Sequence, residues 1–217
     1  MFFNSALQNE RSCYNNNMSN VDERKITILR AALNLVRNMG FEAVSIASLA
    51  KEVGMSKSGL FAHFNSKEKM HLMILDHAAQ TFSEDVFRKS LRAPRGLPRL
   101  KVIVKNWLAW YKVDGGGTCP FIAAAVEYDA KPGRVKQHIQ LHMNRLIHSL
   151  NKSIELCVEQ GDFSAKINTQ AVAFELYSLI IGHLIYLRTL ENKAATNIFY
   201  QAFDSLMNRC SAHQDKI

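Results

Sequence analysis

The sequence predicts an all-α protein, in which a three-helix helix-turn-helix domain precedes a larger helical domain. Apolar residues recur at three- and four-residue steps along most of the 217-residue chain, whereas the alternating pattern of a half-buried strand is nearly absent. The four prolines and ten glycines fall mostly between these periodic stretches, where helices end. We expect about nine helices, near residues 22–39, 45–53, 57–63, 66–91, 97–112, 120–130, 134–160, 168–190 and 194–211.

Composition narrows the class of protein before any motif is considered. Hydrophobic residues make up 47% of the chain and charged residues 21%, which is ordinary for a globular domain with a sizeable core. The net charge of +8 favours a polyanionic partner such as nucleic acid. The four cysteines are widely spaced and form no Cys-x-x-Cys pair, as expected in the reducing cytoplasm. We therefore expect a cytoplasmic protein. We also expect no cofactor.

The chain divides into three expected regions. Residues 1–20 are polar and asparagine-rich, lack the apolar segment of a secretory signal, and are expected to form a disordered tail. Met18, just ahead of the first helix, is a candidate translation start. Residues 21–66 form the expected helix-turn-helix domain, and residues 67–217 form the expected sensor and dimerisation domain.

The first helix has a clear beginning and end. Asn20 stands three residues before Glu23, as in a capping box. Gly40 supplies the left-handed conformation that ends a helix. The apolar stripe between them consists of Ile26, Leu29, Leu33 and Val36.

Residues 45–69 have the pattern of two short helices joined by a tight turn. Ser45 caps the first helix, Gly54 provides the left-handed residue of the turn, and Ser56 caps the second helix. Leu60 and Phe64 are spaced to anchor the second helix on its neighbours. This pattern predicts a helix-turn-helix, whose second helix enters the major groove of DNA.

The opening turn of that second helix has an unusual composition for a packing element. It consists of Lys57, Ser58 and Gly59, and a glycine inside a helix costs about 1 kcal/mol relative to alanine. Small polar side chains here suit base edges or a close approach to phosphate. Ser45, with the amides of its helix, and Lys67, at the start of the following helix, flank this turn as candidate phosphate contacts. Asn65 and Glu68 resemble a capping box for that following helix.

Residues 22–70 resemble the DNA-binding domain of the TetR (tetracycline repressor-like) family. The resemblance covers about the first quarter of the chain, and the remainder matches only as a run of helices. It is carried by the long first helix ending at Gly40 and Phe41, followed by SIASLAKEVGMSKSGLFAHFNSKEKM. The resemblance implies a homodimeric transcription regulator, in most family members a repressor, on a pseudo-palindromic operator of double-stranded DNA. It also implies that a small molecule entering the C-terminal domain changes DNA binding.

The motif and the resemblance together assign residues to the DNA. The family usually has tyrosine where this chain has Phe61, which cannot give a hydroxyl to phosphate, so we expect an apolar contact such as one with a thymine methyl group. For His63, a packed or capping role is an equal alternative. The expected DNA-contacting residues are Ser45, Ser56, Lys57, Ser58, Gly59, Phe61, His63 and Lys67.

Aromatic residues indicate where an effector would bind. Both tryptophans lie within residues 97–112, and aromatic stripes at helical spacing form core more often than pockets. Tryptophan and tyrosine nevertheless combine apolar bulk with a polar tip, which suits a ligand site. The expected ligand-binding residues are Trp107, Tyr111, Cys119, Phe121, Tyr128, Met143 and Tyr177.

Cys119 supports a second hypothesis. Pro120 marks the first position of a helix, so Cys119 would lie at a helix N-terminus, where the pKa of a thiol tends to fall. A thiol-based redox sensor is one interpretation, and a small buried cap residue is the other.

Two histidines raise the question of a metal site. His138 and His142 are four residues apart on an expected helix, a spacing that can hold zinc. No third ligand is obvious, although Glu127, Asp129 and His148 are present, and we expect no metal.

Residues 171–187 are almost entirely apolar. They are short for a membrane span and include Glu175 and His183, so a helix buried on two sides is the better account and no membrane partner is expected. One side should meet the sensor core and the other a twin helix, with Gly182 permitting close approach. The last two helices are thus the expected homodimer interface.

Two other functions are alternatives to a ligand-responsive regulator. The sequence contains no placeable pair of catalytic carboxylates, nucleophile elbow or His-Glu-x-x-His motif, so we do not expect an enzyme. An architectural DNA-binding protein that senses no ligand remains the alternative.

Overall fold

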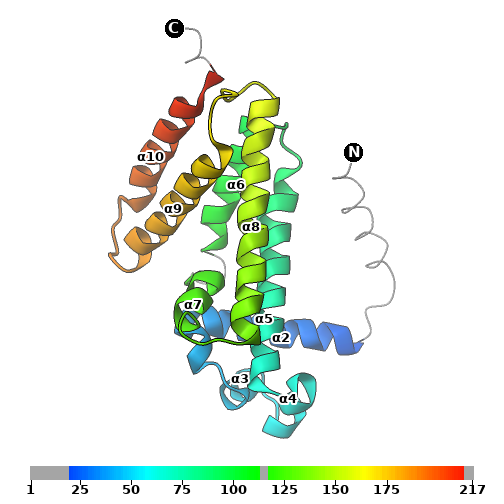
Figure 1. Cartoon of the computed structure of the whole chain (residues 1–217). Helices are drawn as coiled ribbons and strands as arrows, with labels where there is room; N and C mark the ends of the chain where they lie inside the picture. Colours follow the sequence, from blue (N-terminus) through cyan, green and yellow to red (C-terminus); the bar gives the residue numbers. More distant parts are fainter. Residues whose placement is uncertain (1–19, 113–116, 213–217) are drawn as a thin grey trace.

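The computed structural model describes residues 20–112 and 117–212, which are helical apart from short connections (Figure 1). The predicted all-α class is confirmed, and the expected tail lies outside the described residues except for Asn20. The described helices are α2 (Asn20–Ala43), α3 (Ile46–Glu52), α4 (Lys57–Phe64), α5 (Lys67–Phe82), the π-helical η1 (Ser83–Arg88), α6 (Leu97–Trp110), α7 (Pro120–Glu127), α8 (Arg134–Glu159), α9 (Thr169–Arg188) and α10 (Ala195–Cys210).

The molecule is built around long helices that connect a small domain at one end with a helix pair on one flank. In Figure 1, α5, α6 and α8 run along the long axis, while α2, α3 and α4 gather at the lower end. Helices α9 and α10 pack against each other, and α9 also contacts α8. Because α5 follows directly after α4 and also packs on α2 and α8, it links the small domain to the larger one.

The apolar core of the molecule continues beneath the helix-turn-helix. The fully buried side chains there come from α3, α4, the end of α2 and the turn after it. Gly40 interrupts α2 with φ 80° and ψ 172°, so the predicted helix stop is confirmed there. This break allows the chain to turn towards α3. The core members are Phe41, Val44, Leu49, Leu60 and Phe64.

Serine hydroxyls begin the three helices that follow. Ser45 Oγ accepts from the amide of Ser48, and Ser56 Oγ accepts from the amide of Gly59. Ser66, rather than Asn65, caps α5. The expected capping box of α5 is therefore wrong by one residue, because Asn65 adopts the left-handed conformation (φ 63°) that ends α4.

The expected helix over residues 66–91 contains a change of helical type. α5 ends at Phe82, and the chain continues as a π-helix over Ser83–Arg88. In a π-helix, residues five apart lie near the same face. Phe82 and Phe87 consequently pack edge to face, with ring centroids 5.8 Å apart, and both contact Trp107 of α6.

Candidate DNA-binding surface and sensor core

The opening turn of α4 projects from the end of the small domain (Figure 1). Ser56, Lys57 and Ser58 are exposed, whereas Leu60 and Phe64 on the opposite side of the helix are fully buried. The cap bond from the amide of Gly59 to Ser56 Oγ, 3.1 Å long, holds this turn in shape. An anchored helix thus presents a small polar turn to solvent, which is the geometry needed to enter a major groove.

Phe61 belongs to the same exposed surface. Its side chain is 51% exposed and lies one helical turn after Lys57. Large apolar side chains gain by leaving water, so an exposed phenylalanine beside the polar turn suits contact with a partner. His63 is half-buried, which fits a packed or capping role as well as a DNA contact.

The two expected phosphate contacts already have partners within the chain. Ser45 forms a reciprocal capping box with Ser48 and is half-buried. Lys67 Nζ donates to the carbonyl oxygen of Glu42 at 3.0 Å, and its side chain remains 46% exposed. Because an ammonium group has three donor hydrogens, Lys67 can hold the end of α2 and still contact a phosphate.

Glu127 joins the small domain to the larger one, a role that the sequence did not reveal. Its carboxylate accepts from the amides of Phe41 at 3.0 Å and Glu42 at 2.7 Å. A Cβ atom on Gly40 would lie 2.4 Å from Glu127 Oε1. Glycine is therefore required at position 40 both for its positive φ and for this close approach.

A buried histidine forms a second link between the domains. His71 of α5 lies with Nδ1 2.5 Å from the hydroxyl of Tyr128 and Nε2 3.3 Å from the carbonyl oxygen of Val44. Burial lowers the pKa of His71, which favours a neutral ring that donates from Nε2 to Val44 and accepts from Tyr128 at Nδ1. This arrangement connects the α2–α3 turn, α5 and the end of α7.

A third link lies where α6 and α7 approach α2. The guanidinium of Arg37 stacks over the ring of Trp110 at 4.4 Å, and the amide of Thr118 donates to the carbonyl oxygen of Arg37 at 2.9 Å. A Cβ atom on Gly117 would lie 2.5 Å from Arg37 Cβ, so the backbones meet closely here. A movement of α6 or α7 would therefore displace the part of α2 that contains Arg37.

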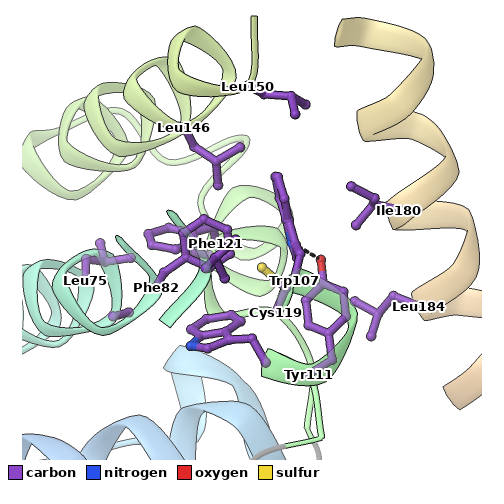
Figure 2. Close-up of a cluster of buried hydrophobic side chains, with 14 of the residues drawn as sticks. Leu75, Phe82, Trp107, Tyr111, Cys119, Phe121, Leu146, Leu150, Ile180 and Leu184 are labelled. Carbon is purple, nitrogen blue, oxygen red and sulfur yellow. Dashed lines mark hydrogen bonds between the residues drawn. The ribbon is translucent and has the colours of Figure 1, made fainter. Parts of the chain in front are cut away.

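Five of the seven expected ligand residues gather in one core region. Figure 2 shows Trp107 and Tyr111 joined by a hydrogen bond, with Cys119 and Phe121 beside them. The bond runs from Trp107 Nε1 to the Tyr111 hydroxyl over 2.8 Å, and the ring of Tyr177 lies 6.0 Å from that of Trp107. These side chains pack on one another between α6, α7 and α9.

The other two expected ligand residues lie elsewhere. Tyr128 and Met143 line a hollow of about 170 Å³ between α7 and α8. Tyr128 is also part of the domain junction through His71, and burial raises its pKa to about 12. The seven residues therefore divide between a packed core and a shallow hollow near the junction.

Cys119 corrects one sequence-based expectation. It lies at the N-cap of α7 as predicted, but it is only 4% exposed. Burial raises its pKa to about 11, although the neighbouring amides of Ile122 and Phe121 act in the opposite direction. The expected lowering of the pKa is wrong, because loss of hydration outweighs the helix N-terminus. The redox hypothesis loses its chemical basis, since the thiolate is the reactive form.

The fold and the exposed motif together define a class, the helix-turn-helix DNA-binding transcription regulators with a helical C-terminal domain. Residues 28–72 match the model of bacterial regulatory proteins of the tetR family. Residues 96–203 match the tetracyclin repressor-like C-terminal domain. The chain belongs to the TetR family, and the resemblance found in its first quarter is confirmed across both domains.

Relatives and solved structures agree with this assignment. Nucleoid occlusion factor SlmA of Haemophilus influenzae is 22% identical over 171 residues, covering 78% of this chain and 78% of that protein. A TetR-family regulator from Cytophaga hutchinsonii has a TM-score of 0.76 at 16% identity, covering 90% of this chain and 98% of the other. AibR, solved with isovaleryl coenzyme A and operator DNA, has a TM-score of 0.62 at 17% identity, covering 86% and 97%.

Proposed function

We propose that this transcription regulator is a repressor that binds a pseudo-palindromic operator as a homodimer and loses or changes DNA binding when a small molecule enters its C-terminal domain. The observation that carries the proposal is the polar opening turn of α4, where Ser56, Lys57 and Ser58 are exposed on a helix whose other side is buried. Phe61 extends that surface, and Lys67 flanks it. A monomer presents one such turn, and a two-fold pair presents two, which matches an inverted repeat.

The domain junction supports a response to a small molecule. Glu127, His71 and Arg37 each connect α2 to the larger domain, and Arg37 contacts Trp110 beside the aromatic core. A ligand that displaced Trp107 or Phe121 would have to move α6 or α7, and α2 with it. AibR, a neighbour of the same fold, was solved with both a coenzyme A ester and operator DNA. That neighbour's fold accommodates both kinds of partner.

An unpartnered apolar face supports the homodimer. α9 is the helix, among those described, that is long and apolar enough to cross a membrane by length and composition alone. Its inner side packs in the core, while the opposite side stays exposed and Gly182 has open space where a side chain would be. We propose that a second copy covers this face, because two helices from each chain form a four-helix interface. The exposed large apolar residues of α9 and α10 are Phe174, Ile185, Tyr186, Ile198 and Tyr200.

Selection from a pool of random duplexes tests the repressor proposal. Full-length protein should enrich one inverted repeat whose half-sites are separated by about one helical turn. A reporter carrying that repeat at its promoter should then be repressed by the protein. Enrichment of no common sequence, or activation of the reporter, would contradict the proposal.

A second candidate function is a DNA-bound role without a small-molecule effector. It is supported by the similarity to nucleoid occlusion factor SlmA, which extends over most of both chains, and by the close packing of the aromatic core. Mapping the protein along the chromosome separates the two functions. A regulator should occupy a few promoters, whereas a nucleoid factor should occupy many sites spread over the chromosome, most of them away from promoters.

A further inference from the structure

Three metal-binding side chains converge between α5 and α8. Asp76 Oδ1 lies 2.7 Å from His138 Nε2 and 2.9 Å from His142 Nε2, and the two nitrogens are 3.1 Å apart. The sequence suggested the two histidines, four residues apart on one helix, but offered no third ligand. Asp76 supplies it from a helix more than sixty residues away, because α5 and α8 pack side by side.

These separations suit a shared ion. Zinc and similar ions bind imidazole nitrogen and carboxylate oxygen at about 2.0–2.2 Å, so neighbouring ligand atoms stand about 3.0 Å apart at octahedral angles and about 3.4 Å apart at tetrahedral angles. The three separations are close to the octahedral value, and a small opening of the side chains would reach the tetrahedral one. One ion above the triangle of atoms would reach each of them without rearrangement of the backbone.

A purely hydrogen-bonded cluster leaves the three atoms crowded. If both Nε2 atoms carry protons, the carboxylate oxygen accepts both N–H groups through its two lone pairs, with the two donor nitrogens only 3.1 Å apart. If one nitrogen lacks a proton, it cannot donate to the carboxylate, and one of the two short contacts is then not a hydrogen bond. A metal ion relieves the crowding, because it takes a lone pair from all three atoms.

We propose that Asp76, His138 and His142 bind a divalent transition-metal ion such as Zn²⁺. Two imidazoles and one carboxylate favour zinc, cobalt, nickel or iron over magnesium and calcium, which prefer oxygen ligands. The site has an inner and an outer side: the His142 side chain is 7% exposed, and the Asp76 side chain is 57% exposed. An ion can therefore enter from solvent past Asp76, and water or an anionic group can occupy the remaining positions.

The bound ion would fasten α5 to α8 next to the sensor core. His142 lies with its ring 6.1 Å from that of Phe121, and α5 leads back to the DNA-facing helix through Ser66. Any effect on operator binding rests on the proposed function. If the protein binds an operator as proposed, an ion that fixes α5 against α8 should change the affinity of the protein for that operator.

Metal titration of the untagged, chelator-treated full-length protein tests the site. Co²⁺ should give visible absorption that saturates at one ion per chain, and Zn²⁺ should displace it. Asp76→Asn and His138→Ala should weaken Co²⁺ binding by at least about tenfold. His148→Ala is the matched control, because His148 is an exposed histidine of the same helix outside the cluster, and it should bind as wild type does. His142→Ala is avoided because that side chain is buried.

The outcomes separate the site from its consequence. Failure of the wild type to bind Co²⁺ or Zn²⁺ stoichiometrically, or unaltered binding in both variants with native circular dichroism, would overturn the proposal. Repeating operator binding with and without Zn²⁺ then tests regulation, since the metal titration needs no DNA. An operator affinity that Zn²⁺ changes in wild type but not in His138→Ala supports metal control. Stoichiometric binding with unchanged operator affinity would retain the site and refute its regulatory effect.

Discussion

At the scale of single residues, the contact between Gly40 and Glu127 decides how the small domain is held. Gly40 has φ 80° and ψ 172°, a conformation available essentially to glycine alone. The absence of a side chain also allows the Glu127 carboxylate to receive the amides of Phe41 and Glu42. One glycine thus serves the end of α2 and the junction between the domains.

Gly40→Ala should lower the free energy of unfolding more than a comparable glycine substitution does. The backbone strain alone costs about 1–3 kcal/mol, and displacement of Glu127 adds to it. Gly133→Ala is the control, because Gly133 also has a positive φ, 139°, but has open space around the position of a Cβ atom. Denaturant unfolding of both variants provides the comparison. Equal losses would show that the Glu127 contact contributes little.

Cys119 should be slow to alkylate in the folded protein. Its thiol is buried and its pKa is raised to about 11, so little thiolate exists at neutral pH. Peptide-resolved mass spectrometry after timed iodoacetamide treatment should find Cys119 modified far more slowly in native than in unfolded protein. Rapid modification at pH 7 with loss of DNA binding would restore the redox-sensor hypothesis.

At the scale of elements, the proposed DNA-binding surface combines α4 with the start of α5. α4 presents Ser58 at its exposed opening turn, and α5 presents Lys67 at its own N-terminus, tied to the end of α2. In the proposed complex, Ser58 would face base edges and Lys67 would face the phosphate backbone. The two elements should therefore respond differently to substitution.

Lys67→Ala should weaken binding to all duplexes alike and reduce the dependence of log K on log salt concentration by about one. Ser58→Ala should instead change the preferred base at one position of each half-site. Binding titrations at several salt concentrations and a repeated sequence selection measure the two effects. Because Lys67 also bonds to Glu42, the thermal unfolding of Lys67→Ala must be measured in parallel. Identical behaviour of the two variants would refute the division of roles.

At the scale of the whole molecule, the proposed homodimer would cover an apolar surface that the single chain leaves exposed. The α9–α10 pair carries Phe174 at 73% exposure together with several other exposed apolar side chains. The paired surface also contains an ion pair between Glu175 and Arg209, which ties the two helices to each other. An exposed apolar face of this kind is expected for the proposed two-fold interface.

Phe174→Asp should convert the protein to a monomer and abolish cooperative binding to the full operator. Both copies use the same surface in a two-fold interface, so each dimer would bury two uncompensated carboxylates. Leu141→Asp is the control, because Leu141 is an exposed apolar residue of α8 outside this face. Sedimentation velocity at several concentrations measures the oligomeric state. A wild type that stays monomeric, or a Phe174→Asp variant that stays dimeric, would contradict the proposed interface.

Local interactions explain why much of this molecule follows from its sequence. The helices, the caps at Ser45 and Ser56, and the stop at Gly40 all depend on residues within a few positions of one another. The helix-turn-helix pattern is equally local, and it led to the family that both domain matches confirm. Caps, glycine and apolar period act over one or two turns, so they can be recognised without knowledge of the fold.

Tertiary packing decided the features that join distant residues. Glu127 meets the amide of Phe41 across 86 positions, and Asp76 meets His138 across 62, so neither partner could be assigned from spacing. The expected lowering of the Cys119 pKa was wrong for a related reason. That pKa depends on burial by neighbouring helices as well as on the helix N-terminus at which Cys119 lies. The sequence by itself determined the helices and their DNA-binding motif. Only the tertiary structure determined which charged and polar groups meet. Those contacts depend on the angles at which the helices pack, and the local sequence pattern does not set these angles.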